Sequence, residues 1–81
     1  MKWIKNIKVG DSVLTIERWH DVVEKWKSEV IAIEHNYVET KYRREMRPEW
    51  NHYVRVYEMQ FVKNYFAPDG TINIEPLVKS E

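Results

Sequence analysis

Residues 28–43 read Ser-Glu-Val-Ile-Ala-Ile-Glu-His-Asn-Tyr-Val-Glu-Thr-Lys-Tyr-Arg and carry the clearest structural pattern in the chain. Residues 29–35 and 37–43 each alternate with a period of two and are rich in β-branched side chains, which is typical of strands. His35 and Asn36 stand between them, and Asn tolerates the left-handed backbone of a tight turn. The sequence therefore predicts an antiparallel hairpin. Its apolar positions on one face are Ile31, Ile33, Val38 and Tyr42, with Thr40 between the last two.

A turn and a strand are predicted upstream of this hairpin. Val9-Gly10-Asp11 indicates a turn, because Gly10 supplies the backbone freedom that a tight turn needs. Residues 12–19 follow as a strand with Leu14 and Ile16 on one face. Residues 2–8, before the turn, are predicted to be a short strand or an N-terminal arm.

Residues 17–29 are ambiguous. Trp19, Val22, Val23 and Trp26 fall at i, i+3, i+4 and i+7, the spacing of an apolar helical face. The segment has no good N-cap residue at its start and no glycine at its end. We expect a long loop that contains about one or two helical turns.

Two further strands are predicted downstream. Residues 44–52 contain Pro48 and read as a loop. Residues 53–66 read as a long strand or a bent pair of strands, with Tyr57, Met59 and Phe61 on one face and a bulge or sharp bend near 58–60. Ala67-Pro68-Asp69-Gly70 has the composition of a turn. Residues 71–78 are the expected last strand, with Ile72 and Ile74 facing inward.

The composition fits one domain spanning residues 1–81. Four Trp, five Tyr and two Phe are expected to supply much of the core. The chain has no cysteine, which excludes disulfides, thiolate zinc sites and thiol nucleophiles. Because the N-terminal residues lack an unbroken apolar run, we expect a soluble, cytoplasmic protein that does not associate with membranes.

The strand pattern resembles the Src-homology-3-like small β-barrels, including the KOW and Tudor groups. The resemblance rests on three stretches, Val9-Gly10-Asp11-Ser12-Val13, Glu29-Val30-Ile31-Ala32-Ile33 and Tyr37-Val38-Glu39-Thr40. It implies an all-β barrel of five to six antiparallel strands, and the partly helical segment predicted from residues 17–29 would be its first loop. It also implies an aromatic-lined groove between loops 17–28 and 44–52, which carry Trp19, Trp26 and Trp50.

Basic and aromatic side chains are interleaved over residues 41–57. Arginine forks and aromatic rings suit the phosphates and bases of single-stranded nucleic acid, and they are equally common at protein-interface hot spots. Thirteen basic and thirteen acidic residues give zero formal charge, which favours a protein partner over a phosphate backbone. The candidate binding residues are Trp19, Trp26, Arg43, Arg44, Arg47, Trp50, Tyr53 and Arg55.

Other interpretations stay open for these residues. The arginines and aromatics are also compatible with a solvated loop and a filled barrel, and Trp19 and Trp26 with a plug over the open end of the barrel. A third possibility is self-association into a homodimer or larger homo-oligomer through the final strand, residues 71–78, although Pro76 would limit such pairing.

The sequence contains no motif of an enzyme. A P-loop, a dinucleotide-binding turn, a nucleophile elbow and a paired-histidine zinc motif are all missing from the 81 residues. His20, His35 and His52 lie far apart and are expected at the surface, so no metal or other cofactor is expected. The sequence predicts a non-enzymatic binding module, such as a small accessory, regulatory or inhibitor protein of the kind that phages encode.

Overall fold

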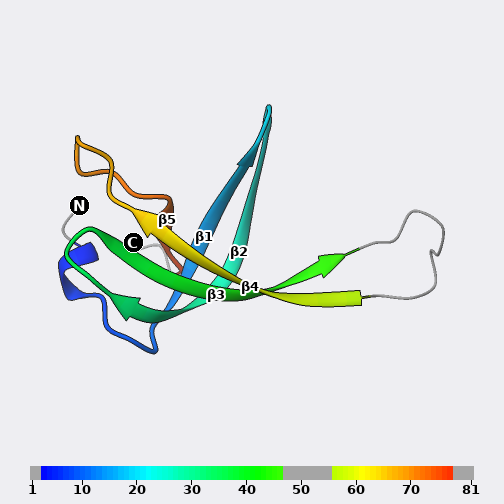
Figure 1. The fold of residues 1–81 in the computed structure, drawn as a ribbon, viewed down its shortest axis with the longest axis horizontal. Coiled ribbons are helices and arrows are strands. Elements are labelled where there is room, and N and C mark those ends of the chain that lie inside the picture. Colours follow the sequence, from blue (N-terminus) through cyan, green and yellow to red (C-terminus); the bar gives the residue numbers. More distant parts are fainter. Residues whose placement is uncertain (1–2, 47–55, 78–81) are drawn as a thin grey trace.

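A computed structural model describes residues 3–46 and 56–77. In that part of the chain a short 3-10 helix, η1 (Trp3–Asn6), precedes the strands β1 (Ser12–Trp19), β2 (Val22–Ile33), β3 (Tyr37–Met46), β4 (Val56–Tyr65) and β5 (Ile74–Pro76). The strands form one five-stranded antiparallel sheet in the order β4-β3-β2-β1-β5 (Figure 1). The predicted all-β class and number of strands are confirmed.

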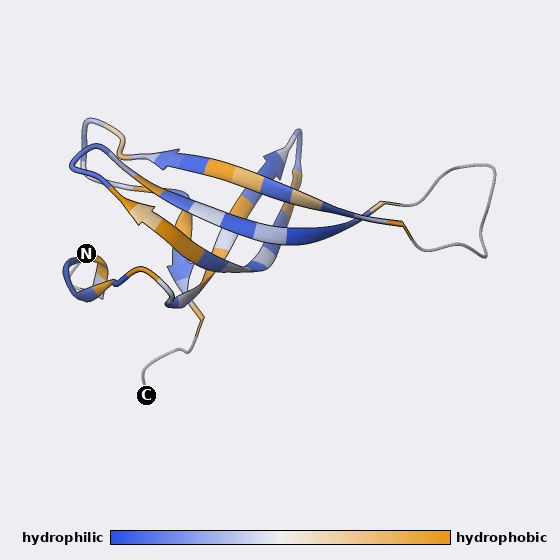
Figure 2. Cartoon of the chain, turned by 60° about the horizontal axis from the view of Figure 1, so that its bottom comes forward, coloured by the Kyte–Doolittle hydropathy of each residue, from blue (hydrophilic) through white to orange (hydrophobic). Residues whose placement is uncertain are grey.

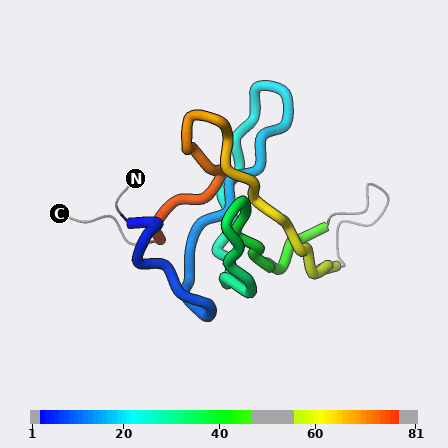
Figure 3. The backbone as a smooth tube through the Cα atoms, turned by 60° about the vertical axis from the view of Figure 1, so that its left-hand side comes forward, coloured from blue at the N-terminus to red at the C-terminus, as the bar shows by residue number. Residues whose placement is uncertain are grey.

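The sheet is strongly curled. Within the described residues β4 and β5 are its two edges, and no strand pairing joins them. The hairpin of β1 and β2 projects in one direction, and the hairpin of β3 and β4 extends in another (Figures 1 and 3). The pairing of β2 with β3 shifts register between Val30 and Ala32, an irregularity of the kind that bends a strand.

The core lies on one side of this curled sheet, which we call the inner face. Val13, Val30, Val38 and Ile74 are buried there, each from a different strand. Trp3, Ile4 and Ile7 pack against them from the N-terminal segment, together with Phe66 and Ile72. The bands of opposite hydropathy along the strands in Figure 2 follow from the period of two, because alternate residues face opposite sides.

A polar cluster continues the core on the same face. Thr15 and Thr40 are buried, and their hydroxyl oxygens lie 2.9 Å apart. The Asn64 amide donates to the Thr40 hydroxyl and to the Val38 carbonyl, each at 3.0 Å. These bonds satisfy groups whose burial without a partner would be costly.

The hairpin of β2 and β3 matches its prediction. Ile33 pairs with Val38, and Glu34 N–H donates to the Tyr37 carbonyl across the turn at 2.9 Å. Val38, Thr40 and Tyr42 share one face of β3, as the alternation predicts, and all three are buried. The two glycine turns are confirmed as well, since Gly10 and Gly70 have φ of 98° and 87°.

The prediction of a partly helical first loop is wrong. Residues 17–29 are extended, and Trp19 pairs with Val22 across a two-residue turn at His20 and Asp21. The apparent helical spacing arises because a hairpin turn interrupts a period of two. Without an N-cap residue a helix gains little, whereas the strand completes backbone hydrogen bonds along the whole of β1.

Other details of the sequence interpretation also need correction. Residues 3–6 are a 3-10 helix and not a strand. The buried face of β1 carries Val13 and Thr15, while Leu14 and Ile16 face the other side. The buried residue of the first hairpin strand is Val30, and Ile33 is exposed.

Three further corrections concern the C-terminal half. β3 continues to Met46, into the segment predicted as a loop. β4 pairs with β3 in one unbroken register, so the expected bulge near 58–60 is absent from the described ladder. The last strand is only three residues long, although Ile74 is buried as predicted. The described core is built mainly from Val and Ile. Of the described aromatic residues only Tyr42 is buried, and Trp19, Tyr57, Phe61 and Tyr65 are exposed.

Candidate functional site

The inner face continues beyond the core toward the tip of the hairpin of β1 and β2. There the alternation of β1, β2 and β3 brings six side chains to one face, and we call them the inner-face cluster. Its members are Glu17, Trp19, Glu24, Trp26, Tyr42 and Arg44. Cross-strand pairing sets the arrangement, since Thr15 pairs with Trp26 and Glu17 with Glu24.

Trp26 and Tyr42 form the base of the cluster. Their rings stack with centroids 5.6 Å apart and an interplanar angle of 10°. The Arg44 guanidinium lies 6.0 Å from the Trp26 ring centroid, at the edge of the range for a cation–π contact. The Ser28 hydroxyl donates to the Trp26 carbonyl at 2.8 Å, which holds this part of β2 further. The indole N–H of Trp26 is buried and has no acceptor among the residues that the structure describes.

Glu17 joins two members of this base. One carboxylate oxygen accepts a hydrogen bond from the Tyr42 hydroxyl at 3.0 Å, and the other lies 3.0 Å from an Arg44 nitrogen. Burial, followed by the hydrogen bond to Glu17 and its negative charge, raises the pKa of Tyr42 to about 12. Tyr42 is therefore a neutral donor at physiological pH, and it fixes the orientation of the carboxylate.

A recess lies next to this base, among the other members of the cluster. Glu17, Trp19, Glu24 and Arg44 line it, and its volume is about 440 Å³. Trp19 is 69% exposed, although a buried or half-buried site is usual for so large a ring. Glu24 lies directly opposite Glu17 in the pairing of β1 with β2, and Arg44 pairs with Glu17. Within residues 3–46 and 56–77 Glu24 has no ion-pair partner, so the recess holds two carboxylates and one guanidinium.

Arg43 belongs to the opposite, outer face. Its guanidinium carbon lies 4.0 Å from the centroid of the Tyr57 ring, a close cation–π contact. A shallow recess of about 320 Å³ beside it includes Lys27, Lys41 and Met59 in its lining. Lys41 also lies 3.7 Å from a Glu29 carboxylate oxygen.

The predicted binding residues are thus divided. Trp19, Trp26 and Arg44 come together in the inner-face cluster, whereas Arg43 faces the other way because strand neighbours alternate. The remaining predicted residues, Arg47, Trp50, Tyr53 and Arg55, lie outside the described residues. Of the two tryptophans, Trp26 is half-buried and Trp19 projects into solvent, so they do not form a common plug.

Sequence reasoning missed Glu17, Glu24 and Tyr42 as members of the site. Their proximity depends on the register between β1 and β2, which a helical interpretation of residues 17–29 conceals. The signal that would have found them is the pair of two-residue alternations on either side of His20 and Asp21.

The part of the chain that the structure describes holds no group of three side chains able to bind a metal ion. None of its helices has the length and apolar character needed to cross a membrane. Compared with known proteins, the chain matches no family model, no curated protein and no solved structure.

Proposed function

We propose that this chain is a non-enzymatic binding module with a Src-homology-3-like barrel fold, and that it engages a protein partner. The fold assignment is supported by the strand order, in which β5 returns to pair with β1 and brings the last strand beside the first. The shift of register in β2 supports the curvature that such a barrel needs.

Trp19 is exposed and lines the recess, and this observation carries the proposed function. Tryptophan is enriched at interface hot spots, and such hot spots are most effective where the surrounding groups are already fixed. The two bonds of Glu17 hold Glu17 and Arg44, two of the residues that line the recess, without a ligand. The stack of Trp26 on Tyr42 supports Glu17 through the Tyr42 hydroxyl. A partner side chain would therefore meet a surface that is largely organised beforehand.

The charges of the recess indicate which side chain would fit. Glu17 is already paired with Arg44, and Glu24 lies opposite it with no ion-pair partner in the described chain. A lysine or arginine of the partner, packed against the exposed face of Trp19, would meet the carboxylate of Glu24. Cation–π contact and charge pairing would then act on the same group.

Affinity capture with matched variants tests this proposal. The immobilised chain, Trp19→Ala and Glu24→Gln are incubated with a cell lysate, and the captured proteins are quantified by mass spectrometry. For a partner that uses the recess, Trp19→Ala is expected to lower the captured amount about tenfold or more, which is the typical effect of removing an interface hot spot. Glu24→Gln is also expected to lower the captured amount of this protein, because the carboxylate can no longer pair with the partner's cation. The size of the side chain is nearly unchanged.

Val23→Ala is the matched control. Val23 lies on the same hairpin, is half exposed and faces the other side of the sheet. Capture by this variant stays at the wild-type level, and the free energy of unfolding of Trp19→Ala changes by less than about 0.5 kcal/mol. A partner retained equally by Trp19→Ala and the wild type would contradict the proposed surface.

Binding of single-stranded nucleic acid is the second candidate function. The outer face favours it through the recess that includes Lys27, Lys41 and Arg43, beside the exposed ring of Tyr57. Anisotropy of a labelled oligonucleotide, measured at low and physiological salt, distinguishes this candidate. Phosphate contacts give affinity that falls steeply with salt and that Arg43→Glu abolishes, whereas Trp19→Ala leaves it unchanged.

A further inference from the structure

Within the described residues β4 is the long edge of the sheet, and no described strand pairs with its outer side. It has ten residues, and it contains neither proline nor glycine. Its pairing with β3 runs without irregularity from Val56 to Tyr65. The other edge, β5, is three residues long and ends at Pro76, which are two common protections against strand pairing. A long regular edge without such protection is a template for another strand.

The hydrogen bonds show which residues of β4 point toward that free edge. Phe66 N–H donates to the Asn36 carbonyl at 3.0 Å, in the same register as the ladder of β3 and β4. Residues of an antiparallel strand bond alternately to one side and the other. The even-numbered residues of β4 therefore bond to β3, and the backbone groups of Tyr57, Met59, Phe61, Lys63 and Tyr65 point away from it.

We propose that β4 pairs with β4 of a second copy of this chain, antiparallel and about a two-fold axis at Phe61. In this register Phe61 lies opposite itself, Met59 opposite Lys63, and Tyr57 opposite Tyr65. Each outward-pointing backbone group then meets another, because odd-numbered residues lie opposite odd-numbered residues. With the axis at Phe61, all five outward-pointing residues of the described strand, 57, 59, 61, 63 and 65, lie opposite one another. With the axis at Gln60, Tyr65 would instead lie opposite residue 55, outside the described residues.

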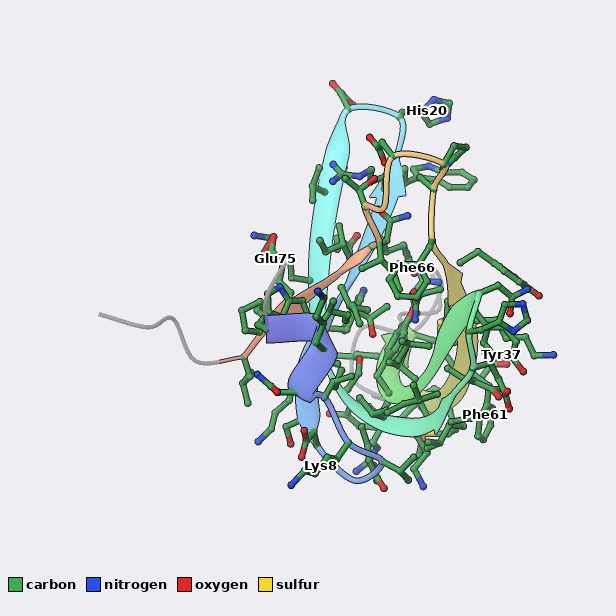
Figure 4. The ribbon with its side chains drawn as sticks, turned by 90° about the vertical axis from the view of Figure 1, so that its left-hand side faces the viewer. Lys8, His20, Tyr37, Phe61, Phe66 and Glu75 are labelled. Carbon is green, nitrogen blue, oxygen red and sulfur yellow. The ribbon has the colours of Figure 1, made fainter. Side chains whose placement is uncertain are left out.

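The side chains agree with this register. Phe61 and Met59 are 62% and 49% exposed on the outer face, and Tyr57 and Tyr65 are exposed beside them. Phe61 and Tyr37 project from the same side of the sheet in Figure 4. In the proposed dimer this side of one copy would continue into the same side of the other. Burial of aromatic rings in cross-strand pairs stabilises an antiparallel sheet.

The charges are also compatible with a second copy. Lys63 lies 5.3 Å from the Tyr37 ring centroid on its own sheet and would face an uncharged Met59. On the inner face Glu58 would lie opposite Asn64, which is buried and uncharged. No like charges stand directly opposite one another in this arrangement. The charges of β4 are thus compatible with pairing to a second β4, whereas many edge strands would place like charges opposite each other.

Site-specific disulfide formation tests the register, because the chain has no cysteine of its own. Directly opposed residues of a hydrogen-bonded antiparallel pair have Cα atoms about 5.5 Å apart, within the range that a disulfide spans. Phe61→Cys is expected to form a covalent dimer rapidly under mild oxidation. Val23→Cys, half exposed on the β1–β2 hairpin, serves as the control and cross-links only slowly by collision. Equal rates for the two variants would overturn the proposed register.

Light scattering during gel filtration tests the dimer itself. The wild-type chain is expected to give the mass of two copies at high concentration, and Phe61→Pro the mass of one. Proline at this position removes an N–H that points away from β3, so the ladder within the chain and its circular dichroism are retained. Phe61→Lys, which would place two ammonium groups opposite each other, gives the same result without a backbone change. A wild-type chain that remains monomeric up to millimolar concentration would overturn the proposal and leave the β4 edge to a strand of another protein.

Discussion

Tyr42 shows at the scale of one residue how the cluster is held together. Its ring stacks on Trp26, and its hydroxyl donates to Glu17. Removing that hydroxyl deletes a hydrogen bond to a charged acceptor, and Glu17 keeps only its contact with Arg44. We expect Tyr42→Phe to lower the free energy of unfolding by about 1.5 kcal/mol, as measured by urea denaturation.

The same hydroxyl makes stability depend on alkaline pH. The pKa of Tyr42 is raised from its ordinary value of 10.0 to about 12, so the folded chain keeps the proton after the unfolded chain has released it. The stabilisation is complete below pH 10 and is lost as the pH rises through the window from 10 to about 12. Absorbance of the phenolate should reveal a late-titrating tyrosine that Tyr42→Phe eliminates and Tyr65→Phe retains. If Tyr65→Phe removed the late step instead, the raised pKa would belong to Tyr65 and the prediction for Tyr42 would be wrong.

The hairpin of β1 and β2 depends, at the scale of an element, on the turn that positions Trp19. His20 has φ of 54°, and it is the only described residue other than glycine with a positive φ. A two-residue turn with positive φ at its first central position normally carries glycine there. Figure 4 shows His20 at the tip of the hairpin. It makes an edge contact with the Trp19 ring, with centroids 5.2 Å apart.

His20→Gly is therefore expected to stabilise the fold. The substitution relieves the left-handed strain, which outweighs the lost ring contact, and we expect the free energy of unfolding to rise by about 0.5 kcal/mol. Thermal unfolding at a fixed protein concentration measures the change. Asp21→Gly is the control, because Asp21 does not have a positive φ and added freedom there destabilises. Stabilisation by Asp21→Gly instead would contradict this account of the turn.

The elements also show which parts of the structure the sequence could predict. The hairpin of residues 29–43 is local, and its alternating pattern and its turn agree, so the sequence predicts its two strands and its turn correctly. The pattern does not show the register shift next to Val30, and therefore it does not predict that Val30 is buried and Ile33 exposed. Residues 17–29 carried an accidental helical spacing, and only their pairing with β1 determines that they are extended. The prediction of the candidate site failed for a similar reason, because it depends on where a strand ends. Arg43 and Arg44 are neighbours in sequence, and only the extension of β3 to Met46 places them on opposite faces.

At the scale of the whole molecule, the described core is small, so the fold has little free energy of unfolding to lose. The described core unites Val13, Val30, Val38 and Ile74, and half-buried residues of the N-terminal segment cover it. Domains of this size bury a modest fraction of their surface and have stabilities near the lower end of about 5–15 kcal/mol. Ile74 is 2% exposed and is the buried residue of the short strand that pairs with β1. It therefore fixes both the core and the position of β5.

We expect Ile74→Ala to lower the free energy of unfolding by about 3 kcal/mol, a large part of the total. Ile33→Ala, at a position that is 40% exposed, should cost less than about 1 kcal/mol and serves as the control. The two variants are compared by urea denaturation at one protein concentration, because dimerisation would make the unfolding midpoint depend on concentration. An unchanged dependence on urea means that β5 stays in place and only packing is lost. A shallower dependence would mean that the native state has already released β5, and equal costs at the two isoleucines would contradict the assigned core.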